Sequence, residues 1–136
     1  MATESLAFSG TFAASTGLKQ YQAVALNAVG VLINPTTEVN RIGILTSSGT
    51  TGSTGRAGST HSGSVQEVQW YGRAKVIAGT TTIDIGDSLK SEADGRASTS
   101  SSTSYRFAVA LSAVDSTSTS AQVISALLMP SAAAFA

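Results

Sequence analysis

The chain has 136 residues, a length that suits one domain with a single modest core rather than two domains. Eight basic and eight acidic residues cancel, so no net field attracts nucleic acid or an anionic membrane, and the absence of cysteine excludes disulfides, thiolate metal sites and thiol nucleophiles. Only 12% of the residues are charged, and the polar surface consists of Ser, Thr, Asn and Gln, which suit extensive contact with other proteins.

Residues 1–20 are predicted to be an N-terminal arm. The segment begins MATESLAFSG, which has neither the basic start nor the apolar run of an export signal, so we expect synthesis in a cytoplasm. It carries Leu6, Phe8 and Phe12 among small polar residues, too few apolar groups to close a core of its own. We therefore expect these three side chains to be buried on a partner.

Residues 21–129 are predicted to form an all-β domain, a small barrel or sandwich of about seven strands. Apolar residues recur at period two in short runs separated by turn residues, which indicates strands rather than helices. The predicted strands are residues 21–26, 31–33, 39–46, 64–78, 81–85, 105–114 and 122–129. In the sixth strand, alternation places the large side chains from Tyr105 to Leu111 on the core face and the small ones between them on the other.

Residues 46–64, TSSGTTGSTGRAGSTHSGS, are predicted to be a mobile, solvated loop between two strands. The glycines at every third position fit neither a phosphate-binding loop, which needs G-x-x-x-x-G-K-[ST] before a helix, nor collagen, which needs many more triplets. His61 lies among serines, but the loop offers no rigid frame and no orienting acid for catalysis. Because such a segment loses much entropy on ordering, we expect it to stay in water.

In the strand 64–78, Trp70 and Tyr71 are adjacent and therefore point to opposite faces, one into the core and the other to a surface or an interface. Either of the two fits the buried position. Arg73 and Lys75 alternate with apolar residues and are expected on a solvated strand face, since a nucleic-acid site would interleave aromatic residues with its cations.

The stretch DIGDSLKSEADG contains four acidic residues: Asp84, Asp87, Glu92 and Asp94. Carboxylates can bind Ca²⁺, but this spacing matches no calcium loop that we can derive. We instead expect Gly86-Asp87 and Asp94-Gly95 to be turns at hairpin ends, with positive φ and hydrogen bonds from the aspartate side chains to the backbone. No metal, no other cofactor and no catalytic residue is therefore predicted.

Pro130 ends the last predicted strand, because proline has no N–H for the ladder. Residues 130–136 are predicted to be a C-terminal tail with one apolar anchor, Phe135. Phe135 joins Leu6, Phe8 and Phe12 as the predicted partner contacts.

Four stretches together resemble one known family: QYQAVALNAVGVLI, VQWYGRAKVIAG, IDIGDSLKSEADGRA and YRFAVALSAVDSTSTSAQVISALLM. Their shared elements are the Gly86-Asp87 turn followed by Leu89, the later Gly95, the small-residue strand FAVALSAV and a terminal alternating strand. This pattern is similar to the small tailed-phage capsid decoration, or cement, proteins. The long loop 46–64 and the two arms depart from the family pattern.

The resemblance implies a structural virion protein rather than an enzyme, one that assembles as a homotrimer on the outside of a phage head and stabilises contacts between major capsid subunits. Such a protein is made in the host cytoplasm, is located on the capsid exterior, and has no nucleic-acid, membrane or small-molecule partner. The alternative is a receptor- or carbohydrate-binding β module, which would usually display more exposed aromatic residues than four Phe, three Tyr and one Trp allow. An enzyme would need His61, Asp84 or Asp87 to meet in one pocket.

Overall fold

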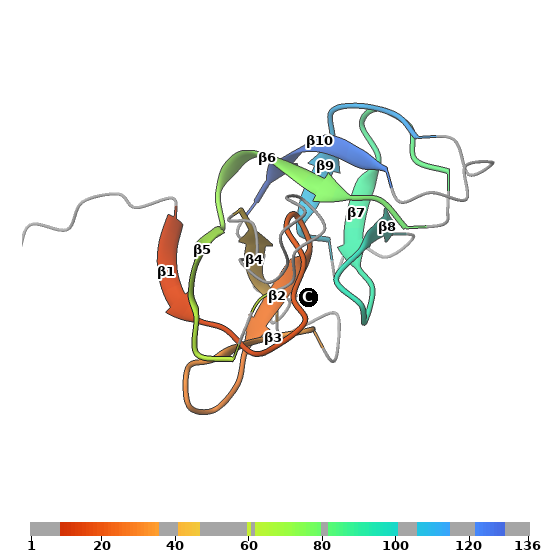
Figure 1. Cartoon of the computed structure of the whole chain (residues 1–136). Helices are drawn as coiled ribbons and strands as arrows, with labels where there is room; N and C mark the ends of the chain where they lie inside the picture. The colour runs from red at the N-terminus through yellow and green to blue at the C-terminus, as the bar shows by residue number, and fades with distance from the viewer. Residues whose placement is uncertain are drawn as a thin grey trace, which may run out of the picture.

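The computed structural model describes residues 9–35, 41–46, 60, 62–79, 82–100, 106–114 and 122–129. These residues form ten β-strands arranged in two antiparallel five-stranded sheets (Figure 1). Neither sheet closes into a barrel, so the all-β prediction is confirmed, with a sandwich as the architecture and ten strands in place of about seven. Within the described ranges no helix occurs, and hence none that could cross a membrane.

The first sheet has the strand order β1-β5-β4-β2-β3. Its strands are β1 (Ser9–Ala13), β2 (Ala23–Leu26), β3 (Leu32–Ile33), β4 (Arg41–Leu45) and β5 (Val65–Gln69). A parallel bridge between Ala14 and Leu32 brings the two edge strands together at one end, so the sheet is strongly curled. Its inner face holds one fully buried cluster: Ala14, Leu18, Val24, Leu32, Leu45 and Val68.

The second sheet has the strand order β6-β10-β9-β7-β8. Its strands are β6 (Gly72–Ile77), β7 (Ser88–Ser91), β8 (Ala97–Thr99), β9 (Ala108–Ala110) and β10 (Val123–Leu128). Its inner face carries the larger buried cluster, which also includes Ala23 and Ile44 from the first sheet. The outer face of the first sheet therefore packs against the inner side of the second, so the larger cluster lies between the two sheets and the smaller one lies on the other face of the first sheet.

The second sheet repeats the topology of the first. Its strand order is that of the first sheet with five added to each number, and parallel bridges join the edge strands of both, Ala14 to Leu32 and Ala78 to Ala97. Three turn hydrogen bonds of the first repeat recur at equivalent positions in the second. Tyr21 N donates to Leu45 O, as Gly86 N donates to Ala110 O, and Asn27 N donates to Val31 O, as Glu92 N donates to Arg96 O. Lys19 N donates to the side chain of Gln22, as Asp84 N donates to the side chain of Asp87. The domain thus consists of two structural repeats, residues 9–70 and 72–129.

Three differences separate the predicted strands from the observed ones. The predicted strand 64–78 is broken after β5, where the chain passes from the first sheet to the second and Gly72 has a φ of 86°. The predicted strand 81–85 contributes only a bridge between Ile83 and Val114. Strands β1, β7 and β8 were not predicted, because their small polar residues lack the alternating large apolar side chains that signal a strand.

Residues 9–20 belong to the domain, so the predicted arm is wrong over this range. Strand β1 pairs with β5 from Ser9, opposite Gln69, to Ala13, opposite Val65, and Leu18 is fully buried. Backbone hydrogen bonds to β5, which is distant in sequence, hold this segment in the sheet. The number of apolar residues within the segment gives no indication of such bonds. Residues 1–8 and the predicted tail 130–136 lie outside the described residues.

The end of the predicted mobile loop is also part of the fold. Thr60 is fully buried, and its Oγ1 accepts a hydrogen bond from Leu18 N at 3.0 Å and donates one to Ser15 O at 2.5 Å. Its backbone N donates to Leu18 O at 3.0 Å. Residues 47–59 and His61 lie outside the described residues, so the expectation of mobility there stays a prediction.

The predicted facing of residues 105–114 is right for Phe107, which is buried, but wrong for residues 108–111. Ala108 and Ala110 are fully buried, whereas Val109 is half-buried and Leu111 is 40% exposed. The reason is the spacing at the inner face: Ala110 lies opposite Ala126, which lies opposite Ala74 on the next strand. Alanines line up across the sheet where the first sheet packs against it, and Val109 and Leu111 take the outer face.

Candidate partner surfaces

Phe12 is the one predicted partner contact that lies among the described residues. It sits half-buried on the inner face of the first sheet, edge-on to Trp70 with ring centroids 6.4 Å apart and an interplanar angle of 63°. Phe12 is therefore no free anchor on an arm, because it packs against the core of its own domain. Leu6, Phe8 and Phe135 lie outside the described residues, and their role stays a prediction.

Four large side chains rim the buried cluster of the first sheet and are only partly covered: Phe12, Leu26, Ile42 and Trp70. We call them the open side of the first sheet. Sequence reasoning identified Phe12 and offered Trp70 as a candidate for burial. It missed Leu26 and Ile42, which sit in runs that read as ordinary core strands.

The Trp70 and Tyr71 pair behaves as predicted, with one residue at the core and the other at the surface. Trp70 packs against the cluster of the first sheet, and Tyr71 is 47% exposed. The predicted exposure of Arg73 and Lys75 is also confirmed, since both are exposed on β6, where they alternate with the buried Ala74 and Val76.

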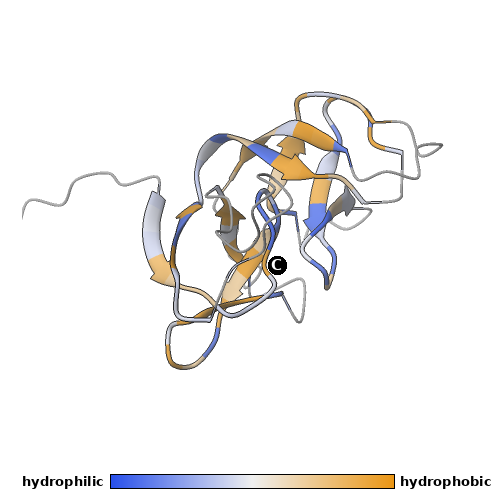
Figure 2. Cartoon of the chain, viewed as in Figure 1, coloured by the Kyte–Doolittle hydropathy of each residue, from blue (hydrophilic) through white to orange (hydrophobic). Residues whose placement is uncertain are grey.

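The outer face of the second sheet carries a second apolar surface, formed by Val109, Leu111 and Leu127. Leu127 lies directly opposite Val109 across the β9–β10 ladder, and Leu111 N donates to Ser125 O beside them. Leu111 and Leu127 are 40% and 41% exposed. Figure 2 shows the apolar colouring along these two strands. These aliphatic side chains lie together on one face, which makes this face a candidate partner surface.

The acidic stretch forms turns, as predicted. Gly86 and Gly95 have φ values of 93° and 85°, Asp87 Oδ2 accepts from Asp84 N at 2.8 Å, and Asp94 Oδ1 accepts from Arg96 N at 3.1 Å. The Glu92 carboxylate accepts a hydrogen bond from the Ser98 hydroxyl. In the part of the chain that the structure describes, no three His, Cys, Asp or Glu residues gather into a potential metal site.

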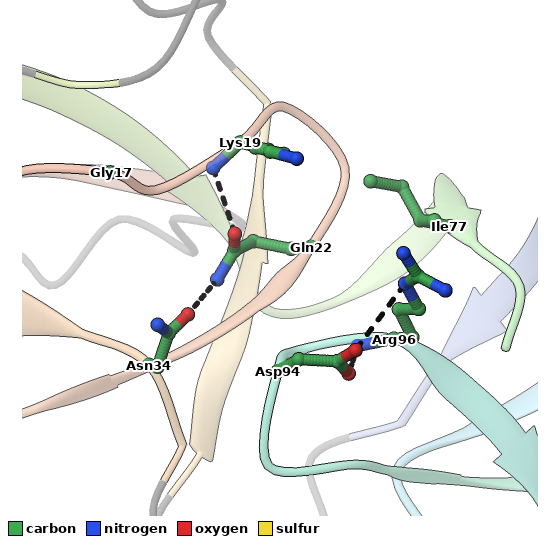
Figure 3. Close-up of a pocket in the computed structure, with 7 residues that line it drawn as sticks. All are labelled: Gly17, Lys19, Gln22, Asn34, Ile77, Asp94 and Arg96. Carbon is green, nitrogen blue, oxygen red and sulfur yellow. Dashed lines mark hydrogen bonds and ion pairs between the residues drawn. The ribbon is translucent and has the colours of Figure 1, made fainter. Parts of the chain in front are cut away.

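A cleft of about 220 Å³ lies where the two repeats meet, and Figure 3 shows the residues that line it: Gly17, Lys19, Gln22, Asn34, Ile77, Asp94 and Arg96. Gln22 is buried there, accepting from Lys19 N at 2.8 Å and donating to Asn34 Oδ1 at 2.6 Å. Arg96 pairs with Asp94 at 3.3 Å. The bonds of Gln22 lie within the first repeat and the Asp94–Arg96 pair lies within the second, so each wall of the cleft is held by its own bonds.

Tyr21 holds the two repeats together on the other side of this seam. Its N donates to Leu45 O at 2.6 Å in the first repeat, and its O accepts from Ile77 N at 3.0 Å in the second. Its φ of 69° is rare for a residue with a side chain, and these two bonds hold it there. The ring lies 5.8 Å from Lys75 Nζ and lines a second, more open cleft with Thr46, Gln69, Arg73, Ala74, Lys75 and Ser125.

The fold is similar to that of the head fiber gp8.5 N base in bacteriophage phi29, with a TM-score of 0.64 and 19% sequence identity. The match covers 90% of this chain and 94% of that chain. No family model and no curated protein matches the sequence. At this identity the likeness assigns the fold alone.

Proposed function

We propose that this protein is a structural virion protein of a tailed phage, which binds the outside of the head and stabilises contacts between major capsid subunits. It acts without catalysis, cofactor, nucleic acid, membrane or small-molecule substrate. It assembles as a homotrimer, is made in the host cytoplasm and takes its place on the capsid exterior.

The likeness to a head fiber base carries this proposal. It extends over nearly the whole of both chains, so it concerns the complete two-sheet architecture and not a common fragment. Folds host many functions, so the likeness supports a place on a phage head only together with surface chemistry that fits it.

The surface chemistry fits binding to proteins. Leu111 and Leu127 are exposed together on one sheet face, where they would be covered by a partner. The acidic side chains of the turns bond to their own backbone or to neighbouring polar groups. Both features suit a component that is held in an assembly by contact area.

Leu6, Phe8 and Phe135 remain the proposed capsid contacts. Phe12 packs within its own domain, so the proposed N-terminal capsid contacts are Leu6 and Phe8 alone. When three copies engage a lattice together, a modest contact per copy becomes tight through effective concentration, and loss of the anchors then has an outsized effect.

The test is sedimentation of the purified protein with empty heads built from the capsid protein of the same genome. We expect the double variant Leu6→Ala with Phe8→Ala to lose attachment at least about tenfold, because each buried apolar side chain contributes about 1.5–3 kcal/mol before ordering costs. Replacing residues 47–59 by a short Gly-Ser turn, which spares the buried Thr60, should leave attachment intact.

Circular dichroism of both variants serves as the control for folding. Attachment that survives loss of the two apolar anchors but disappears with the shortened loop would reverse the assigned roles. Retention of the wild-type protein on glycans of the host surface, with none on heads, would overturn the proposal in favour of a receptor-binding module.

A further inference from the structure

The strand ladders fix which residue of the first repeat is equivalent to which residue of the second. The parallel bridges align Ala14 with Ala78, and the ladders opposite β4 and β9 align Val68 with Ala126. The four residues of the open side then have these equivalents in the second repeat: Phe12 and Val76, Leu26 and Ser91, Ile42 and Phe107, Trp70 and Leu128.

The four equivalents in the second repeat are all buried, with exposures of 1% for Val76, 1% for Ser91, 6% for Phe107 and 2% for Leu128. The cause is the first repeat, whose outer face supplies Ala23 and Ile44 to the same cluster. The Arg41 guanidinium also lies over the Phe107 ring at 5.1 Å. In the second repeat the equivalent surface is thus buried, and in the first repeat the residues that the structure describes cover it only in part.

The reverse holds for the outer faces. In the first repeat Ala23 and Ile44 are fully buried against the second repeat, whereas their equivalents, Ser88 and Val109, are half-buried. At two further positions a polar residue of the first repeat corresponds to an apolar residue of the second: Thr46 is equivalent to Leu111, and Gln69 is equivalent to Leu127. The outer face that stays exposed is therefore the more apolar of the two, opposite to what water would favour for a lone molecule.

We propose that the outer face of the second sheet of one copy packs on the open side of the first sheet of a second copy, which repeats between chains the contact made within each chain. Both surfaces are apolar, and each is the equivalent of a surface already buried against its counterpart in the same chain. The inference concerns contact between copies and goes beyond the proposed attachment to a head.

The contact within the chain also specifies the polar bonds between chains. Ile77 N donates to Tyr21 O, and Ala23 N donates to Gly95 O. The equivalent bonds between copies run from Ala13 N of one copy to Gly86 O of the other, and from Ser88 N to Gly30 O. Arg41 has its equivalent in Arg106, which is exposed and would lie over Ile42 of the other copy.

An interface of this kind is heterologous, because each copy contributes a different surface to its two neighbours. Such contacts close into rings or grow into fibres, and they differ in one testable respect from two-fold contacts. A copy with a damaged open side and a copy with a damaged outer face each fail to self-associate, but together they retain one intact interface.

The first experiment measures mass in solution by light scattering for the wild-type protein, Leu26→Asp, Leu111→Asp and an equal mixture of the two variants. We expect an oligomer for the wild type at micromolar concentration, association at least about tenfold weaker for each variant alone, and a dimer for the mixture. Val65→Asp is the matched control, since Val65 is 69% exposed and lies outside both surfaces. A monomeric wild type, or a mixture that stays monomeric, overturns the proposal.

The second experiment leaves the open side untouched and uses Trp70, the single tryptophan, as the reporter. We expect Leu127→Asp to make Trp70 fluorescence more accessible to acrylamide, because the surface that covers Trp70 belongs to another copy. Wild-type protein should show the same increase on dilution. The proposal is wrong if neither Leu127→Asp nor dilution changes the quenching of Trp70. It is also wrong if quenching rises only when residues 1–8 or 130–136 are removed, because the open side is then covered by its own chain.

Discussion

At the scale of single residues, the contact between the repeats depends on how closely two backbones approach. Gly95 has no side chain, and this lets the two backbones come close, because a Cβ at this position would lie 2.7 Å from Ala23 O. Gly30 is its equivalent in the first repeat, with a similar φ of 80° but no atom within 4 Å of a Cβ. Substitutions at these two glycines therefore distinguish the cost of a positive φ from the cost of a steric clash between the repeats.

We therefore expect Gly30→Ala to lower the free energy of unfolding by about 1–2 kcal/mol, the cost of a positive φ for a residue with a Cβ. Gly95→Ala should lose about 3 kcal/mol or more, because the clash with Ala23 adds to the same conformational cost. Urea titration of both variants, at a protein concentration where the chain is monomeric, gives the two values. Equal losses would show that the backbones of the repeats do not need this approach.

At the scale of elements, β1 is the strand whose role the sequence obscures. It is the edge of the first sheet, it pairs with β5 along its length, and Phe12 places its ring against Trp70 on the inner face. Thr11 points to the other face and is exposed. If β1 belongs to the fold, the stability of the protein should depend on the side chain at position 12 and not on the side chain at position 11.

Phe12→Ala should accordingly destabilise the protein by about 2 kcal/mol, less than the 3–5 kcal/mol typical of a fully buried Phe because this ring is half-exposed. Thr11→Ala should change stability by less than about 0.5 kcal/mol. Thermal unfolding followed by circular dichroism measures both. If the stability of Phe12→Ala equals that of the wild type, the segment is an arm after all.

At the scale of the whole molecule, the two repeats share the larger buried cluster and should unfold as one unit. Ile44 belongs to the first sheet but is fully buried in the cluster of the second, together with Ala23. The larger cluster is thus incomplete without the first repeat, and the outer face of the first sheet loses its cover when the second repeat unfolds.

We expect Ile44→Ala to cost about 2–5 kcal/mol and to shift two transitions together, the fluorescence of Trp70 in the first repeat and the far-ultraviolet signal of both sheets. Denaturant titrations with the two probes, at one fixed protein concentration, test this. Transitions that separate in the variant or in the wild type would indicate repeats that fold independently.

The sequence by itself determined the features that depend on neighbours along the chain. Alternation gave the β class, and Gly86-Asp87 and Asp94-Gly95 gave their turns. These succeed because turn chemistry and side-chain direction are local properties of the backbone. For the same reason the exposure of Arg73 and Lys75 could be predicted.

Only the tertiary structure decided what covers each sheet face. The inward facing of Ala108 and Ala110, the membership of β1 and the burial of Thr60 all depend on partners far away in sequence. The repeat itself is nearly invisible in the sequence, because equivalent positions share few identities: Ala14 and Ala78, Ala28 and Ala93, Gly30 and Gly95, Arg41 and Arg106, Val65 and Val123. Ladder pairing and burial need only compatible size and polarity, so topology persists where residue identity does not.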